Sequence, residues 1–293
     1  CPETAPFGLL GGALWYDGFI PDTPRLVIET LRWACAKGAR VLNYVEALSP
    51  IVTLGRVEGL CARDVLTDEA LSFRAPWIIN AAGPWAPDFA AACGAQEAGL
   101  FPPSLAWNVV FDRPPPAQSA LAVRARRRGA LTYFLVPWKG ALLAGTGHTP
   151  WPHGSDNAKP TRDMLSRFIA EINEALPALH LHEDRIARVF SGLLPARREG
   201  SSELAVREII RDHAAHGGPA GLISVSGVKL TTSRRVADKV LRQVAPEAQA
   251  TPYAAFARPA SRQAEPDYGF DWRPGPGDNA WRADLGTAIA DEA

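Results

Sequence analysis

The stretch Ser226-Gly227-Val228-Lys229-Leu230-Thr231-Thr232 joins an apolar strand to a helix and is the most informative part of the chain. Residues 222–225 (LISV) predict a short buried strand before it, and valine and leucine recur at helical spacing over residues 236–244 after it. We expect Thr231 and Thr232 to cap that helix. Free backbone N–H groups, the helix dipole and the Lys229 ammonium would then favour a bound anion. An ordinary strand, turn and helix with a surface lysine is the alternative.

Composition excludes several classes of protein. The 293 residues are 47% hydrophobic and 21% charged, which is typical of a globular protein with one large domain or two. Lysine plus arginine equals aspartate plus glutamate at 31 each, so no net charge favours nucleic acid as a partner. The four cysteines lack metal-ligand spacing, which predicts reduced thiols, a cytoplasmic protein and no metal site. No apolar run is long enough to cross a bilayer.

The order of expected elements divides the chain. A helix over 24–37, a strand over 39–45, a hairpin over 51–64 and a short strand over 77–80 (WIIN) predict a first α/β unit, residues 1–103. Strands over 105–111, 131–138 and 141–146 and a helix over 161–175 predict a β-rich second domain, residues 104–184. Strands over 185–194 and 204–210 lead back to the first unit, residues 185–250. For residues 251–293 we expect a linker rich in proline, glycine and aspartate and then the start of a truncated C-terminal region.

A second motif, Asn80-Ala81-Ala82-Gly83-Pro84-Trp85, directly follows the WIIN strand. Small residues at the carboxyl end of a strand let a ligand approach the backbone, and α/β sheets bind cofactors at that edge. Close packing between a helix and the sheet is the alternative explanation.

Five segments in order resemble the FAD-dependent glycerol-3-phosphate dehydrogenases, within the D-amino-acid-oxidase-like flavoprotein superfamily. They are Trp15-Tyr16-Asp17 with Asp22 and Arg25-Leu26, Gly38-Ala39-Arg40-Val41-Leu42, Asn80 to Trp85, Phe134-Leu135-Val136-Pro137-Trp138 with Ala144-Gly145-Thr146, and Ser226 to Thr232. The resemblance implies an α/β (α+β) fold: a discontinuous FAD-binding Rossmann-like domain, incomplete at its N-terminus, with an inserted antiparallel β-rich substrate domain.

The resemblance also implies where FAD is held. The segment at Val45 would pass the adenine, and Ala81, Ala82, Gly83 and Trp85 would lie along the cofactor. The turn from Gly227 through Val228, Lys229 and Leu230 to Thr231 would meet the isoalloxazine edge, where positive charge suits the anionic reduced flavin. Lys229 would then lie near both flavin and substrate and act in catalysis.

Two further residues are candidates for the substrate side. Arg207 matches an arginine that binds substrate phosphate in the family, and a guanidinium suits a phosphate or a carboxylate. His148 follows a strand of the β-rich part and could act as general base. A surface strand residue and a turn histidine without a role are the respective alternatives.

The chain also departs from the family pattern. Leu194 stands in place of an arginine that faces substrate, Trp107 in place of a frequent catalytic histidine, and Val228 in place of a second glycine. The G-x-G-x-x-G motif that holds the pyrophosphate is absent, and Gly145-Thr146-Gly147 is not followed by a third glycine. We therefore expect a further segment before Cys1, without which FAD would bind poorly.

Three functions remain open from the sequence. The first is an FAD-dependent dehydrogenase of a phosphorylated polyol or related small molecule, passing electrons to a quinone. The second is an amine or amino-acid oxidase that uses oxygen, and the third is a non-catalytic fragment. Arg124-Ala125-Arg126-Arg127-Arg128 could contact anionic lipid at the inner face of the membrane, although a solvated loop explains it too.

Overall fold

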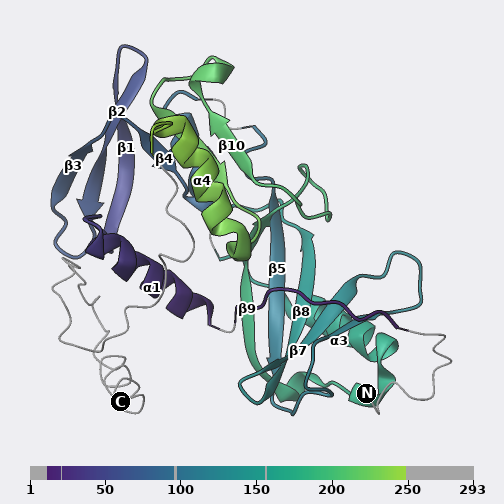
Figure 1. Cartoon of the computed structure of the whole chain (residues 1–293). Coiled ribbons are helices and arrows are strands. Elements are labelled where there is room, and N and C mark those ends of the chain that lie inside the picture. The colour runs from purple at the N-terminus through teal and green to yellow at the C-terminus, as the bar shows by residue number, and fades with distance from the viewer. Residues whose placement is uncertain (1–11, 21, 96–97, 156, 249–293) are drawn as a thin grey trace.

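The computed structural model describes residues 12–20, 22–95, 98–155 and 157–248, and the expected linker lies outside these ranges. Helix α1, Thr23–Ala36, confirms the first expected helix. Asp22 caps it, because its side chain accepts a hydrogen bond from the backbone N–H of Arg25 at 3.1 Å, and Pro24 occupies the first turn. Figure 1 shows α1 beside the first of three sheets.

The first sheet is an antiparallel meander of β1, Val45–Thr53, β2, Arg56–Asp64, and β3, Ala70–Arg74. Its first hairpin turns at Leu54 and Gly55, both at positive φ, and confirms the expected hairpin. The strand expected over residues 39–45 is wrong except at its last residue. Tyr44 has a φ of 55°, in the left-handed region, so an extended chain cannot run through it, and β1 begins only at Val45.

The second sheet joins segments that lie far apart in the chain. Strand β4, Ile78–Asn80, pairs in parallel with β11, Leu222–Ser226, which pairs antiparallel with β10, Ile209–Asp212. Helices α2, Ala86–Ala92, and α4, Ser233–Val244, follow the two parallel strands. The chain thus leaves this sheet after β4 and returns to it much later, as a discontinuous α/β unit requires.

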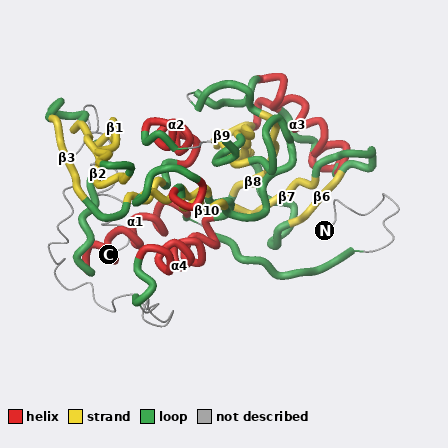
Figure 2. Tube along the Cα trace, turned by 90° about the horizontal axis from the view of Figure 1, so that it is seen from above, coloured by secondary structure: helices red, strands yellow, loops and turns green. Residues whose placement is uncertain are grey.

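The third sheet has the order β6-β7-β8-β5-β9, with every pair antiparallel. Its strands are β5, Pro103–Phe111, β6, Leu121–Arg124, β7, Thr132–Trp138, β8, Ala141–Pro150, and β9, Ile186–Pro195. Helix α3, Arg162–Ala175, covers one face and buries Phe168, Ile169 and Ile172 against it. In Figure 2, α3 lies on one side of β7 and β8 and α4 on the other.

The strand pairing in the structure differs from two boundaries expected from the sequence, the end of the β-rich domain and the start of the strand after it. Strand β9 pairs with β5 along its whole length, so the β-rich sheet extends to Pro195, beyond residue 184, and we propose the domain boundary after Pro195. The strand expected over 204–210 is displaced to Ile209–Asp212. The reason is that Leu204 bridges Ala196 and closes a turn over residues 197–203 instead of continuing a strand.

Candidate functional site

The carboxyl ends of the two parallel strands lie side by side. Asn80, the last residue of β4, pairs with Ser224 of β11 in the parallel register. The Asn80 amide donates at 2.8 Å to the carbonyl of Ala86 and at 3.0 Å to the Ser224 hydroxyl, and its oxygen accepts from the N–H of Ala82 at 3.4 Å. One buried side chain therefore fixes both ends of the turn that the NAAGPW motif forms.

His213 completes this network below the turn. Its Nε2 lies 2.8 Å from the Ser224 hydroxyl, and the ring is 1% exposed. Burial lowers the pKa of His213, with the charge of Arg211 adding to the effect, so the ring is neutral near pH 7. The sequence analysis includes Asn80 only as the first residue of the NAAGPW motif, and it misses Ser224, in the middle of β11, and His213, directly after β10.

The turn after β11 is open to solvent. Gly227, Lys229 and Leu230 are exposed, and no described residue accepts a hydrogen bond from the backbone N–H of residues 227–230. Residues Leu230–Thr232 form a single 3-10 turn before α4. The threonine caps expected from the sequence are absent, because the Thr232 hydroxyl donates to the Lys229 carbonyl at 2.9 Å rather than accepting from a helix N–H. The helix start is thereby left free for a ligand.

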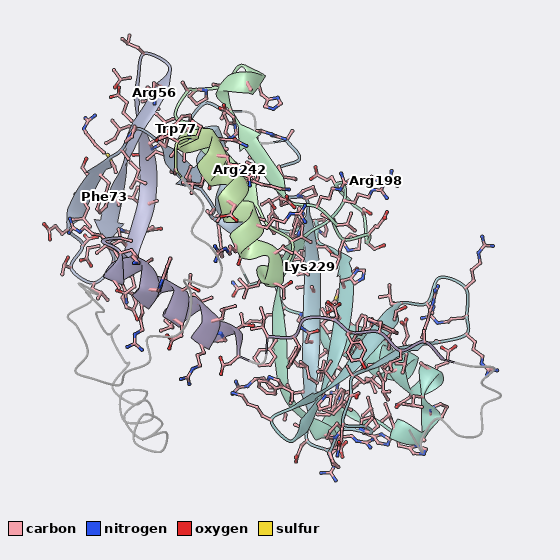
Figure 3. All side chains as sticks on the ribbon, viewed as in Figure 1. Arg56, Phe73, Trp77, Arg198, Lys229 and Arg242 are labelled. Carbon is pink, nitrogen blue, oxygen red and sulfur yellow. The ribbon has the colours of Figure 1, made fainter. Side chains whose placement is uncertain are left out.

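The residues present fit an aromatic, partly anionic cofactor at these two strand ends. Apolar surface is exposed beside both turns, at Ile79 (40%), Trp85 (53%) and Leu230 (39%). The Ser226 hydroxyl at the end of β11 is buried and has no hydrogen-bond partner among the described residues. Figure 3 shows Lys229 at the end of α4 nearest the five-stranded sheet. Apolar contact, free donors and a nearby cation are what a flavin ring requires.

The structure does not gather every expected residue at this point. Residues 81–85 and 227–231 both follow these adjacent parallel strands, but Val45 opens β1 in a different sheet, which contacts this region through β1 against α2 and β2 against β4. Arg207 lies in the exposed segment before β10 and lines a hollow of about 750 Å³ together with Arg198. No ion pair to either guanidinium is found within the described ranges.

The face of the five-stranded sheet opposite α3 carries a second group of side chains. His148 on β8 pairs with Ala106 on β5 and points away from α3, because its neighbour Gly147 packs under Trp107 on the α3 side. The His148 Nδ1 is buried without a partner. Burial lowers the pKa of this imidazole, and the backbone of Ser202 opposes that shift, so the ring is neutral near pH 7 and able to accept a proton.

One departure from the family pattern, Trp107, has a structural explanation. Trp107, 6% exposed, lies in the core with its ring edge-on to Phe168, at 6.3 Å between centroids, and does not occupy the open face. On the open face the same part of β5 presents Asn108 instead, between the exposed rings of Phe134 on β7 and Phe190 on β9. Asn108 was also missed, although it is the one amide within the apolar run of residues 104–111.

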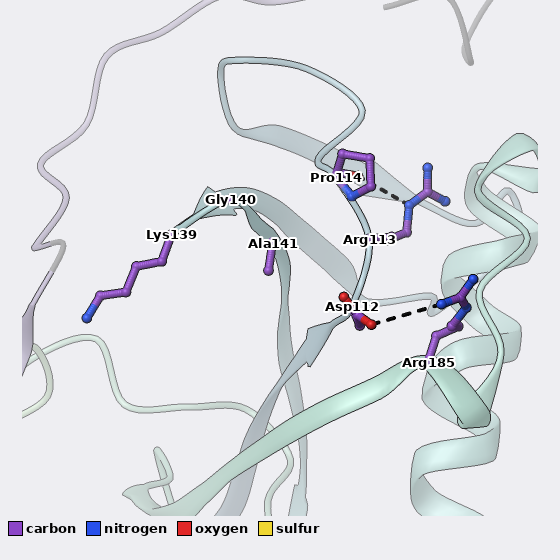
Figure 4. A pocket seen from close by; sticks show the side chains of 7 residues that line it. All are labelled: Asp112, Arg113, Pro114, Lys139, Gly140, Ala141 and Arg185. Carbon is purple, nitrogen blue, oxygen red and sulfur yellow. Dashed lines mark hydrogen bonds and ion pairs between the residues drawn. The ribbon is translucent and has the colours of Figure 1, made fainter.

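Other features of the described residues do not add to this site. A hollow of about 550 Å³ at the far end of the sheet is lined by Asp112, Arg113, Lys139 and Arg185, with Arg185 lying 4.0 Å from Asp112 (Figure 4). No group of three metal-ligating side chains exists in the part of the chain that the structure describes. In the same ranges, no helix combines the length and apolarity needed to span a membrane.

Comparison with known proteins identifies the architecture. The sequence model of the family described as FAD dependent oxidoreductase, DAO, matches residues 1–237. The glycerol-3-phosphate dehydrogenase of Synechocystis is 30% identical over 260 residues, and the aerobic glycerol-3-phosphate dehydrogenase of Staphylococcus aureus is 26% identical over 269 residues. These alignments cover 81% and 91% of this chain and 45% of each relative.

A solved structure agrees with the sequence comparison. The glycerol-3-phosphate dehydrogenase of Bacillus halodurans, complexed with FAD, superposes with a TM-score of 0.62 at 28% identity, over 76% of this chain and 42% of that one. The chain thus spans about 45% of the length of the curated relatives it matches. The match over residues 1–237 and the shared fold show that the chain belongs to the FAD-dependent oxidoreductase family.

Proposed function

We propose that this chain forms the flavin-edge and substrate-facing part of an FAD-dependent dehydrogenase that oxidises a small hydroxyl compound, such as a phosphorylated polyol. The observation that carries the proposal is the pair of open turns at the ends of β4 and β11, with Lys229 beside them and an open sheet face beyond. The turn over Gly83–Trp85 also contacts β9, so the two parts of the site adjoin. Similarity to glycerol-3-phosphate dehydrogenases supports the same reading.

Each candidate site residue has a definite role in this proposal. The open N–H groups of residues 227–230 and the Lys229 ammonium hold negative charge at the flavin edge. The neutral His148 imidazole accepts the proton of the substrate hydroxyl, and Arg207 holds an anionic group of the substrate. FAD, when bound, supplies the acceptor for the hydride that leaves the substrate carbon.

Val45 and the turn over residues 81–85 have the remaining role, that of contacting the cofactor along its length. The electron acceptor in this proposal is a quinone, and the protein would work in the cytoplasm with peripheral contact to a membrane. The exposed Arg124 and Arg128 near β6 offer positive charge for such a contact.

Anaerobic stopped-flow reduction tests the proposal. The chain, or any longer reading frame that contains it, would be loaded with FAD and mixed with glycerol 3-phosphate or with a panel of amino acids. Reduction by glycerol 3-phosphate, and by no amino acid, supports the dehydrogenase. Reduction by amino acids with peroxide release in air would instead support an oxidase.

Lys229→Met separates the role of the lysine from that of the fold. The variant should bind FAD but reduce it more slowly, because the positive charge beside the reduced flavin is lost. Lys239→Met on α4 is the matched control, since its ammonium pairs with Glu208 instead of lying at the turn. An unchanged rate of flavin reduction in Lys229→Met would overturn the role given to this residue.

A further inference from the structure

The segment Gly145-Thr146-Gly147 shapes the sheet around two neighbouring residues of β5. A Cβ on Gly147 would lie 2.4 Å from the Trp107 ring, and a Cβ on Gly145 would lie 1.7 Å from the Asn108 Oδ1. The register shifts between Trp107 and Asn108, so that Thr146 is an extra residue in β8. Each glycine therefore makes room for one side chain, Trp107 on the α3 face and Asn108 on the open face.

The amide of Asn108 has a fixed orientation. The Thr146 hydroxyl donates a hydrogen bond to its Oδ1 at 3.0 Å, and the side chain lies flat over the α-carbon of Gly145. The Asn108 Nδ2 has no hydrogen-bond partner among the described residues and is not buried. Its two N–H groups are therefore held at the open face of the sheet as free donors.

Aromatic side chains border Asn108 on both sides. Phe134, Gly145, Asn108 and Phe190 are cross-strand neighbours on four successive strands, and both rings are well exposed, at 45% and 39%. Neighbouring strands lie about 4.8 Å apart, so the backbones of β7 and β9 lie roughly 14 Å apart here, and we call the surface between them, with Gly145 and Asn108 in its floor, the slot. The Phe190 ring also packs edge-on against Trp138 of β7, with 5.9 Å between the ring centroids. The guanidinium of Arg188 lies 5.7 Å from the Phe190 ring centroid and places positive charge at the slot.

We propose that Asn108 is a specificity-determining residue: its amide donates a hydrogen bond to a substrate hydroxyl or carbonyl oxygen in this slot. The inference rests on the proposed function, which puts the substrate on this face, and it goes further by selecting oxygen over nitrogen. A hydroxyl or carbonyl oxygen accepts from the amide, whereas a protonated amine has no lone pair and meets both these N–H groups and the charge of Arg188.

His148 lies on the same face, opposite Ala106, which is two positions along β5 from Asn108, so His148 and Asn108 are diagonal neighbours roughly 7–8 Å apart. One substrate hydroxyl can thus lie between the amide donor and the neutral imidazole. Thr146 acts as the positioning residue, because it touches Asn108 rather than the substrate.

Matched ligand pairs test the proposal on FAD-loaded protein. The pairs differ only in hydroxyl or amine: glycolate and glycine, D-lactate and D-alanine, and glycerol 3-phosphate and serinol phosphate, in which an amine replaces the 2-hydroxyl. Dissociation constants come from the change in flavin absorbance. The side-chain amide signals of Asn108, identified by their loss in Asn108→Asp, report contact directly by nuclear magnetic resonance.

The expected result is binding of at least one hydroxyl ligand, tighter than its amine partner, with a shift of the Asn108 amide signals. Asn108→Leu should weaken that ligand about three- to tenfold, as for one lost hydrogen bond, and leave the amine partner unchanged. Thr146→Val should give a smaller loss in the same direction. Thr132→Val, an exposed threonine at the start of β7, is the control and should change nothing.

The outcomes separate this inference from the proposed function. Binding of a hydroxyl ligand with equal affinity in Asn108→Leu, or without a shift of the Asn108 signals, overturns the role of Asn108 and leaves the dehydrogenase intact. Tighter binding of the amine members overturns the selection of oxygen. Failure of every ligand in both sets overturns the inference together with the proposed function.

Discussion

Replacing Ser224 with alanine tests whether the buried network holds the two parallel strands and the cofactor turn together. The Ser224 hydroxyl has two partners, the Nε2 of His213 at 2.8 Å and the Nδ2 of Asn80 at 3.0 Å, and all three residues are at most 4% exposed. The substitution leaves His213 without any partner and leaves one Asn80 N–H unpaired, while the bond from Asn80 to Ala86 remains.

Each buried polar group left without a partner costs about 1–3 kcal/mol, so we expect Ser224→Ala to lower the free energy of unfolding by about 2–4 kcal/mol. For a protein of this size that corresponds to a fall in Tm of the order of 10 °C. Urea unfolding followed by circular dichroism measures the loss. Ser72→Ala, an exposed serine on β3, is the matched control and should stay within about 0.5 kcal/mol.

A double variant gives a sharper result than either single change. His213→Leu with Ser224→Ala removes both polar groups, so the double variant should lose less stability than the sum of the two single losses. A loss below about 0.5 kcal/mol for Ser224→Ala, or strictly additive losses, would refute the network. Ser224→Ala should also bind FAD more weakly, because Ser224 accepts from Asn80, and Asn80 fixes the turn over residues 81–85.

Three further predictions follow from the packing and the titrations. Gly147→Ala should destabilise the protein by about 1–3 kcal/mol in urea unfolding because its Cβ would lie 2.4 Å from the Trp107 ring, whereas Gly192→Ala, with open space around it, should not; equal losses would contradict this packing. Burial lowers the pKa values of His148 and His213, so the unfolded chain binds more protons than the folded protein below about pH 6.5. The free energy of unfolding should therefore be full above that pH and fall below it, and an unchanged free energy of unfolding from about pH 7.5 to 5.5 would oppose this. Asp22→Ala should destabilise α1 by about 1 kcal/mol through loss of its N-cap, measurable by the same unfolding assay, and an unchanged midpoint would exclude the cap.

Local patterns were enough to predict most of the elements. The apolar periodicity of α1 and α3, the hairpin of β1 and β2, and the β runs after Pro103 all correspond to structure. The strand over 39–45 failed because a positive φ at Tyr44 is a tertiary choice that periodicity does not encode. The threonine caps failed because capping propensity does not reveal whether the hydroxyl will instead bond the preceding carbonyl.

The candidate site was predictable where it depends on a contiguous motif and not where it depends on register. The turns after β4 and β11 follow from sequence because each is a short segment after a buried strand. Asn108, Phe134 and Phe190 come together only through strand pairing, and one extra residue at Thr146 decides which face each side chain occupies. A single sequence carries no signal for that bulge.

The most direct test of this account is an experimental structure of the protein with FAD bound. We predict that the N1 and C2 carbonyl edge of the flavin ring lies within hydrogen-bond distance of the backbone N–H groups of residues 227–230. We further predict that the reactive face of the ring looks toward the open face of the five-stranded sheet, with Asn108 and His148 across from it. A ring bound away from the ends of β4 and β11, or facing another surface, would contradict the account.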